Sequence, residues 1–118
     1  MAAALRPNPP LDIEVLTWSG CPSTPALLDD LRVALAEIGL DVTAVRMTAV
    51  EDDAEAQRRH FVGSPTVLVE GRDAVPPPPY EAAALTCRVY RRRDGSISPT
   101  PDPLDLRAAL NGALRERG

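Results

Sequence analysis

Apolar residues occur along this chain in short runs and in helical stripes, and the two patterns alternate. Residues 13–18 form an apolar, β-prone run that Gly20 ends, which predicts a buried strand. From 27 to 38, leucine, alanine and isoleucine recur at three- and four-residue spacing, which predicts an amphipathic helix. Gly39 follows, and glycine commonly ends a helix because it adopts the left-handed conformation without strain.

The middle of the chain repeats this alternation. Residues 42–47 predict a second strand, and 51–60, with acids first and bases last, predict a short helix because that order suits the helix dipole. A third strand with a turn is expected over 66–71. Residues 72–86 include four consecutive prolines at 76–79, so we expect an extended, irregular insertion there, either a tolerated loop or a lid over a site.

The end of the chain supplies a last strand and a last helix. Alternation over 87–92 predicts an edge strand that pairs antiparallel with the third, and an apolar stripe at 106–114 predicts a C-terminal helix. The order β-α-β-α-β-β-α predicts an α/β fold, a four-stranded mixed sheet with helices on both faces. We expect one domain over 13–116, with 72–86 as its insertion and 1–12 as a flexible N-terminal tail.

The amino-acid composition excludes several classes of function, although it says little about the fold. The chain has 118 residues, of which 44% are apolar, and its net charge of −4 argues against nucleic-acid binding. No apolar run approaches the length of a membrane span, and the first residues do not resemble a secretion signal. Two cysteines do not make the disulfide framework of a small secreted protein. We therefore expect a cytoplasmic protein with reduced thiols and without nucleic-acid or membrane partners.

Cys21 is the first candidate for chemistry because it lies between the first predicted strand and the first predicted helix. The positive end of a helix stabilises a thiolate, which makes a cysteine at this junction a candidate reactive thiol. A free cysteine can instead serve as a small buried hydrophobe, and this second interpretation stays open.

Two short motifs and the element order resemble the thioredoxin family over nearly the whole chain from 13 to 114. The motifs are the Gly-Cys-Pro sequence around Cys21 and the Ser-Pro-Thr sequence around Pro65. The resemblance implies that Cys21 is the nucleophile and that Pro65 follows a cis peptide bond and faces it. Where the family usually has a second cysteine this chain has Thr24, which resembles the monothiol sites of some glutaredoxin-like proteins. Thr24 is then either a hydroxyl donor to the thiolate or an ordinary first-turn residue.

A narrower resemblance is to short bacterial thioredoxin-like proteins that are often labelled alkylmercury lyase. It is carried by the same motifs, the proline-rich insertion and the Cys-Arg-x-Tyr-Arg sequence that starts at Cys87. This resemblance implies mercury or organomercury handling through Cys21 and Cys87. The lyase chemistry also needs a carboxylic acid that delivers a proton, and the sequence identifies none.

Cys87 has two interpretations of its own. Because the third strand is expected to run away from Cys21, the start of the fourth falls at the far end of the sheet, which favours a structural or idle thiol. The insertion at 72–86 is nevertheless long enough to span the domain, and it would then bring Cys87 back as the thiol that resolves a mixed disulfide. Arg88 and the arginines at 91–93 are expected on a solvated sheet edge, and the alternative is that they bind an anionic thiol cofactor or a partner protein.

The sequence therefore predicts a thioredoxin-fold protein in which Cys21 attacks a disulfide, a thiol adduct or a soft electrophile. Its expected partner is a low-molecular-weight thiol or a protein disulfide, its expected enzyme class is thiol-disulfide oxidoreductase, and no cofactor is expected. Two cysteines and one histidine without a Cys-x-x-Cys pair predict no metal site. The alternatives are a non-catalytic binding module and mercury handling. The expected site residues are Cys21, Thr24, Pro65 and Cys87.

Overall fold

The computed structural model of the protein describes residues 11–117. The part of the predicted tail at 1–10 lies outside the described residues. Leu11 is buried in the core, and Asp12 forms an ion pair with Arg46 at 2.8 Å. Residues 11 and 12 therefore belong to the folded domain, which extends further toward the N-terminus than the boundary predicted from the sequence.

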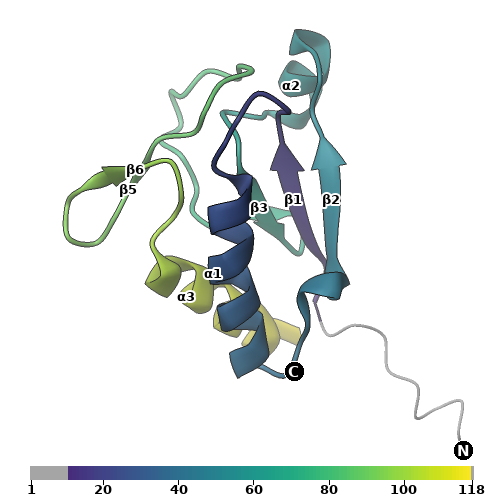
Figure 1. Ribbon diagram of the computed structural model, residues 1–118, viewed down its shortest axis with the longest axis vertical. Helices are drawn as coiled ribbons and strands as arrows, with labels where there is room; N and C mark the ends of the chain where they lie inside the picture. The colour runs from purple at the N-terminus through teal and green to yellow at the C-terminus, as the bar shows by residue number, and fades with distance from the viewer. Residues whose placement is uncertain (1–10, 118) are drawn as a thin grey trace, which may run out of the picture.

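The described residues form three α-helices, one 3-10 helix and six strands (Figure 1). In chain order they are β1 (Ile13–Thr17), α1 (Thr24–Glu37), η2 (Val42–Ala44), β2 (Val45–Ala49), α2 (Asp53–Arg59), β3 (Thr66–Val69), β4 (Arg72–Asp73), β5 (Tyr90–Arg91), β6 (Ile97–Ser98) and α3 (Pro103–Arg117). Among these residues, none of the helices has both the length and the apolar surface that crossing a membrane requires.

The main sheet has four strands in the order β2-β1-β3-β4. Strands β1 and β2 are parallel and are connected by α1, and β3 is antiparallel to both β1 and β4. Val15 at the centre of β1 pairs with Met47 on one side and Val67 on the other. The predicted mixed four-stranded α/β sheet is confirmed.

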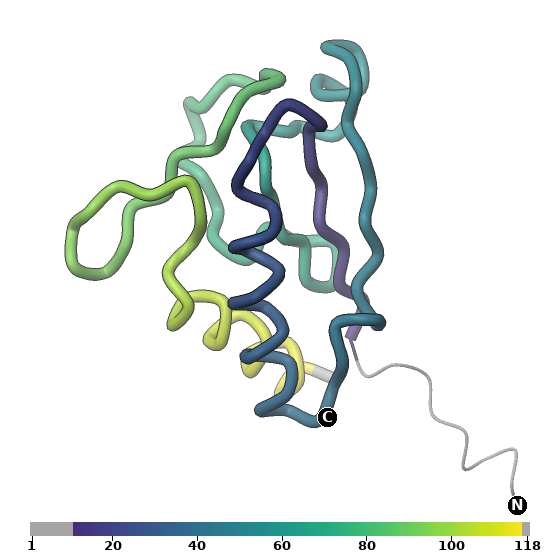
Figure 2. Tube along the Cα trace, in the orientation of Figure 1, coloured from purple at the N-terminus to yellow at the C-terminus, as the bar shows by residue number. Residues whose placement is uncertain are grey.

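Helices α1 and α3 lie on the same face of this sheet and contact each other (Figures 1 and 2). Between the sheet and the two helices lies the larger core, which is entirely aliphatic, as the scarcity of aromatic residues requires. It consists of Leu11, Ile13, Val15, Leu27, Leu31, Ala34, Leu35, Val67, Val69, Leu106, Leu110 and Ala113.

The opposite face is covered only at one end. There the short helix α2 packs through Ala56 on a smaller core that also contains Leu16, Val50 and Phe61. The prediction of helices on both faces therefore holds for the end of the sheet where β1 and β2 finish (Figure 1).

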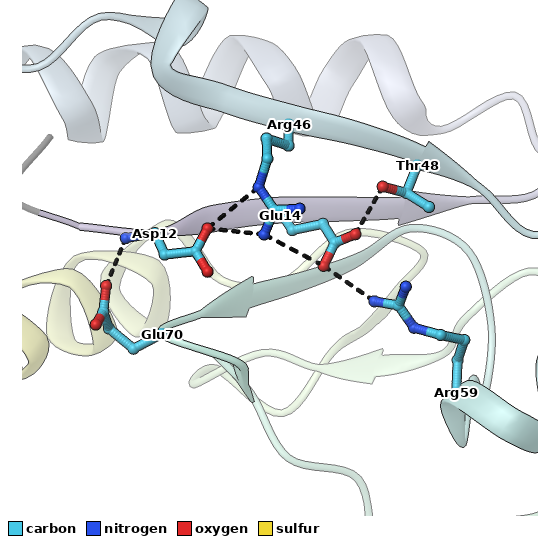
Figure 3. Close-up of polar contacts among 6 residues, drawn as sticks. All are labelled: Asp12, Glu14, Arg46, Thr48, Arg59 and Glu70. Carbon is cyan, nitrogen blue, oxygen red and sulfur yellow. Dashed lines mark hydrogen bonds and ion pairs between the residues drawn. The ribbon is translucent and has the colours of Figure 1, made fainter.

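The uncovered part of that face carries an ion-pair network centred on Glu14 of β1 (Figure 3). Its carboxylate accepts hydrogen bonds from Thr48 Oγ1 at 2.6 Å and Arg59 Nη2 at 2.9 Å, and Arg46 lies 3.7 Å away and also contacts Asp12. Burial raises the pKa of Glu14, but these hydrogen bonds and the two arginine charges outweigh it, so the pKa lies below its ordinary value.

The fourth strand of the sheet differs from the prediction. It is Arg72–Asp73, whereas residues 90–91 of the predicted edge strand pair with β6 in a separate two-stranded hairpin. Glu70 and Gly71 have φ values of 54° and 79°, which form a two-residue turn that pairs Val69 with Arg72. The chain thus reverses at once and adds its next residues to the sheet, because the nearest partner for β3 is the segment that directly follows it.

Helix α1 begins after Cys21 and not at it. Ser23 is the N-cap residue and the helix starts at Thr24, with Pro25 in the first turn, where its missing N–H costs nothing. At the other end, Gly39 has a φ of 80° and ends the helix as predicted. The predicted second strand is split, because Asp41 caps the short helix η2 before β2 begins.

Candidate functional site

Three segments that are distant in the sequence meet at one end of the sheet. Strands β1 and β3 are antiparallel, so the end of β1 adjoins the start of β3, where Leu16 pairs with Thr66. The loop from β1 to α1 carries Cys21, whose backbone N–H donates to the carbonyl of Trp18 at 3.0 Å. The third segment is 86–88, which the chain brings to the same end before it enters β5 (Figure 2).

Cys21 and Cys87 are in contact across this junction. Cys87 Sγ donates a hydrogen bond to Cys21 Sγ at 3.6 Å, and both cysteines are free. When protonated, Cys21 Sγ donates to the carbonyl oxygen of Ser64 at 3.2 Å. Cys21 is buried, with 9% of its surface exposed, whereas Cys87 is exposed. The site is therefore a pair of thiols of unequal accessibility.

The surroundings give the two thiols different acidities. Burial raises the pKa of Cys21, but hydrogen bonds from the Ser23 backbone, from the side chains of Ser64 and Cys87 and from the Ser23 side chain outweigh it, so the pKa is lowered. The Ser64 hydroxyl accepts from the Trp18 N–H at 3.0 Å, which leaves its hydrogen free for the sulfur. The pKa of Cys87 is raised by its hydrogen bond to Cys21, by burial and by the charge on Cys21. The first proton to be lost therefore leaves Cys21, and Cys87 keeps its own.

The backbone holds Cys87 beside the start of β3. Ser64 N–H donates to the carbonyl of Thr86 at 2.8 Å, and Arg88 N–H donates to the carbonyl of Ser64 at 2.9 Å, which makes a parallel β-bridge between Ser64 and Cys87. The backbone N–H and C=O of Ser64 are thus both hydrogen-bonded to the segment that carries Cys87.

The buried side chain of Arg88 holds the same segment through contacts in the protein interior. It is 3% exposed and pairs with Asp73 Oδ2 at 2.7 Å. It also donates to Thr66 Oγ1 at 3.1 Å and to the carbonyl of Val75 at 2.6 Å. Because a buried guanidinium needs several acceptors, these contacts restrict Arg88, and with it Cys87, to one position.

Two further contacts tighten this packing. Tyr90 Oη donates to the carbonyl of Pro65 at 2.6 Å, and the Arg88 guanidinium lies 4.4 Å from the centre of the Tyr90 ring. Gly63 has a φ of 147°, and a Cβ atom there would lie only 2.6 Å from Arg88 Cα. A glycine is therefore required at 63, because the backbone of the Cys87 segment passes directly against it.

A hollow of about 230 Å³ opens beside Cys87. Cys87 lines it together with Val62, Pro77, Pro78, Glu81, Thr86, Arg88 and Val89, whereas Cys21 is not among its lining residues. A larger hollow of about 410 Å³ shares Pro77, Pro78 and Val89 with it and continues toward Ile97. Access from solvent to the thiol pair is therefore on the Cys87 side.

The structure brings three of the four predicted site residues together. Cys21 and Cys87 are in contact, and the Ser64–Pro65 peptide bond is cis, as predicted, with the Ser64 carbonyl against Cys21. The expectation that Cys87 falls at the far end of the sheet is wrong, because β4 ends at Asp73 and residues 74–86 return the chain to Cys21. Among the described residues, the donors to Cys21 come from Ser23, Ser64 and Cys87, and Thr24 is the first residue of α1.

Sequence reasoning missed three residues of this site. Ser23 and Ser64 each stand next to a residue that the motifs identified, so a search for hydroxyl donors beside Cys21 and Pro65 finds them. Arg88 was expected on a solvated edge, but it is buried. The sequence of the arginine cluster contains no signal that shows which of its members is buried.

Within residues 11–117, histidine, cysteine and acidic side chains form no group of three or more that could hold a metal ion. Comparisons of the chain with protein-family models, with curated proteins and with solved structures found no match.

Proposed function

We propose that the protein is a thiol-disulfide oxidoreductase in which Cys21 and Cys87 alternate between a dithiol and a disulfide. One observation carries the proposal: the two sulfur atoms lie 3.6 Å apart, with the Cys87 thiol donating a hydrogen bond to Cys21 Sγ. A disulfide has a sulfur-sulfur distance of about 2.05 Å, so a modest movement joins them.

A thioredoxin-like fold is part of the same proposal. It is supported by the parallel β1-α1-β2 unit, by the antiparallel β3 and β4, and by the position of α1 and α3 on one face. It is also supported by the position of Cys21 between the first strand and the first helix. This protein differs from a local two-cysteine motif in that its second thiol comes from a distant segment, which the chain folds back onto the site.

The reaction requires no group beyond the thiols and an external disulfide. One protein thiolate attacks a sulfur of that disulfide, a protein–substrate disulfide forms, and the first substrate thiolate leaves and takes up a proton. The other protein thiol loses its proton and attacks the protein sulfur, and the second substrate thiolate leaves. The substrate gains two electrons, and the protein becomes the Cys21–Cys87 disulfide, which an external dithiol reduces again.

The test is to oxidise the protein with glutathione disulfide and to map the products by peptide mass spectrometry. We expect a disulfide between Cys21 and Cys87 and no stable glutathione adduct. We expect a Cys87→Ser variant to retain glutathione on Cys21, and a Cys21→Ser variant to retain it on Cys87. If the unmodified protein keeps two free thiols or two glutathione adducts, the two cysteines are not a redox pair, and a non-catalytic binding module becomes the better interpretation.

Capture of a soft metal cation is the second candidate function. The observation that favours it is the same pair of free thiols, one of which belongs to an exposed residue that lines a hollow together with Glu81. Thiolates prefer soft cations, and two sulfur atoms suit a cation that takes two ligands. Titration with Hg²⁺ tests this candidate: we expect one ion per chain, and loss of tight binding in both single Cys→Ser variants. Equal binding by the unmodified protein and by Cys87→Ser would contradict it.

A further inference from the structure

We propose that Cys87, and not Cys21, is the sulfur that exchanges directly with external thiols, and that Cys21 is its buried partner. The inference rests on the proposed function, because it assigns separate roles to the two members of the redox pair. It differs from the sequence-based expectation, in which Cys21 is the sulfur that attacks the external disulfide.

Accessibility is the first argument. Thiol-disulfide exchange needs an incoming sulfur that approaches the attacked sulfur in line with the bond that breaks. Cys21 is 9% exposed, and its sulfur is in contact with the carbonyl of the fully buried Ser64 and with Cys87 Sγ. Cys87 is exposed and lines the hollow beside the site, on the side from which an external thiol can approach.

The leaving group is the second argument. Attack on Cys87 expels Cys21 as the thiolate, next to the Ser23 N–H and the Ser64 hydroxyl, which stabilise negative charge there. Attack on Cys21 would expel Cys87, for which the described residues supply no comparable donor. A thiol of lower pKa leaves faster, so this argument selects the same sulfur as accessibility does.

Backbone pairing explains how the exposed thiol stays in place. The bridge between Ser64 and Cys87 and the buried Arg88 hold the segment on both sides of Cys87. Cys87 is therefore an exposed residue whose sulfur stays in contact with Cys21 Sγ. An external group need only reach the hollow formed by Val62, Pro77, Pro78 and Val89.

The exchange step balances as follows. An external thiolate forms a bond to Cys87 Sγ while the Cys21–Cys87 bond breaks, and the electron pair leaves on Cys21 Sγ. A second external thiolate attacks the external sulfur of this mixed disulfide, an external disulfide is released, and Cys87 takes up a proton. Two external thiols are oxidised and the protein gains two electrons. In the reverse direction, Cys87 loses its proton and attacks an external disulfide, and the first external thiolate leaves and takes up that proton. The Cys21 thiolate then attacks Cys87 Sγ, and the second external thiolate leaves.

The decisive experiment uses the oxidised protein. It is mixed with reduced glutathione, quenched in acid at short times, alkylated and mapped by peptide mass spectrometry. We expect glutathione on Cys87 and the alkyl group on Cys21 in at least nine tenths of the adduct, which is roughly a tenfold preference. Glutathione on Cys21 in more than that remaining tenth overturns the proposal.

The single-thiol variants separate this inference from the proposed function. The rates at which Cys21→Ser and Cys87→Ser react with glutathione disulfide are measured across pH and divided by the thiolate fraction. We expect the Cys87 thiolate to react at least tenfold faster than the Cys21 thiolate, and a smaller ratio overturns the inference. These variants give an answer even if the unmodified protein forms no internal disulfide, in which case the redox pair fails on its own.

Discussion

At the scale of single residues, the chemistry depends on where the protein puts one negative charge. Cys21 is buried, which by itself opposes ionisation, yet the Ser23 N–H, the Ser64 hydroxyl and the Cys87 thiol are directed at its sulfur. Hydrogen bonds to a charged group are stronger than those to a neutral one, so they act on the thiolate more than on the thiol. The helix that follows contributes through its N-cap residue.

Removal of the Ser64 hydroxyl should therefore raise the pKa of Cys21. In a Ser64→Ala variant, we expect the pH midpoint of iodoacetamide labelling at Cys21 to move upward, because one donor to the thiolate is lost. Residue-resolved labelling across pH measures it. Ser98→Ala is the control, since Ser98 lies in the β5–β6 hairpin and its hydroxyl is hydrogen-bonded to Thr100. An unchanged midpoint in Ser64→Ala would contradict the assignment of this donor.

The charge on Glu14 contributes to the stability of the fold. We expect Glu14→Gln to lower the free energy of unfolding at neutral pH by about 2 kcal/mol, because hydrogen bonds to a charged group contribute about 1.5–3 kcal/mol. The matched control is Glu37→Gln, whose exposed pair with Arg107 should contribute well under about 1 kcal/mol. Urea unfolding of both variants measures the difference.

The pH dependence of this effect has a defined sign. The folded pKa of Glu14 lies below its unfolded value of about 4.3, so its stabilisation is fully present above that value and is lost as the pH falls through the folded pKa. The difference between the unmodified protein and Glu14→Gln should therefore shrink when the unfolding is repeated at about pH 3. A constant difference across pH would show that the carboxylate charge is not responsible.

At the scale of elements, the site depends on a bridge between the residues just before β3 and the segment that leads into β5. Ser64 and Cys87 pair there, Gly63 leaves room for the Arg88 backbone, and the Arg88 side chain pairs with Asp73 in β4. The position of the second thiol is thus set by contacts with the residues just before β3 and with β4.

Gly63 has no room for a side chain in this arrangement, because the Arg88 backbone lies directly against it. We expect Gly63→Ala to destabilise the protein by about 1–3 kcal/mol more than Gly95→Ala, because a side chain forced into packed surroundings adds that cost to the backbone strain. Gly95 is the matched control, since it also has a positive φ, of 90°, but has open space around it. Thermal or urea unfolding measures the difference, and equal losses would contradict the close approach to Arg88.

Much of this architecture is predictable from local patterns. The first strand, α1 with its end at Gly39, α2, β3 and the last helix follow from apolar periodicity and end signals, and Pro65 and Cys21 follow from motifs. The fourth strand and the place of Cys87 do not, because they depend on the two-residue turn at Glu70 and Gly71 and on where a proline-rich segment returns. Such long-range returns leave no periodic signal in the sequence.

At the scale of the whole molecule, the thiol pair joins segments that are 66 residues apart. Closing a loop of that length lowers the entropy of the unfolded chain, and the loop-entropy relation gives about 4 kcal/mol for it. The proposed disulfide would therefore couple the redox state of the site to the stability of the fold.

We accordingly expect the oxidised protein to unfold at a higher urea concentration than the reduced protein, by up to about 4 kcal/mol in free energy. Cys87→Ser supplies the control, because its stability should not respond to oxidant or reductant. Parallel urea titrations of both proteins, with and without a reducing agent, measure the effect. An oxidised protein that is no more stable than the reduced one would show that the disulfide strains the fold as much as it restrains the unfolded chain.

The path of the segment that brings Cys87 to Cys21 also affects how such a site can evolve. The returning segment passes through Pro78, Pro79 and Tyr80, which are exposed, while the sheet and the donors around Cys21 are built from other parts of the chain. An insertion or deletion in that exposed stretch would alter the reach of Cys87 and leave every neighbour of Cys21 other than Cys87 in place. One-thiol and two-thiol versions of this protein are thus separated by the length of a loop, so that natural variation in length can convert one chemistry into the other without a substitution at the site.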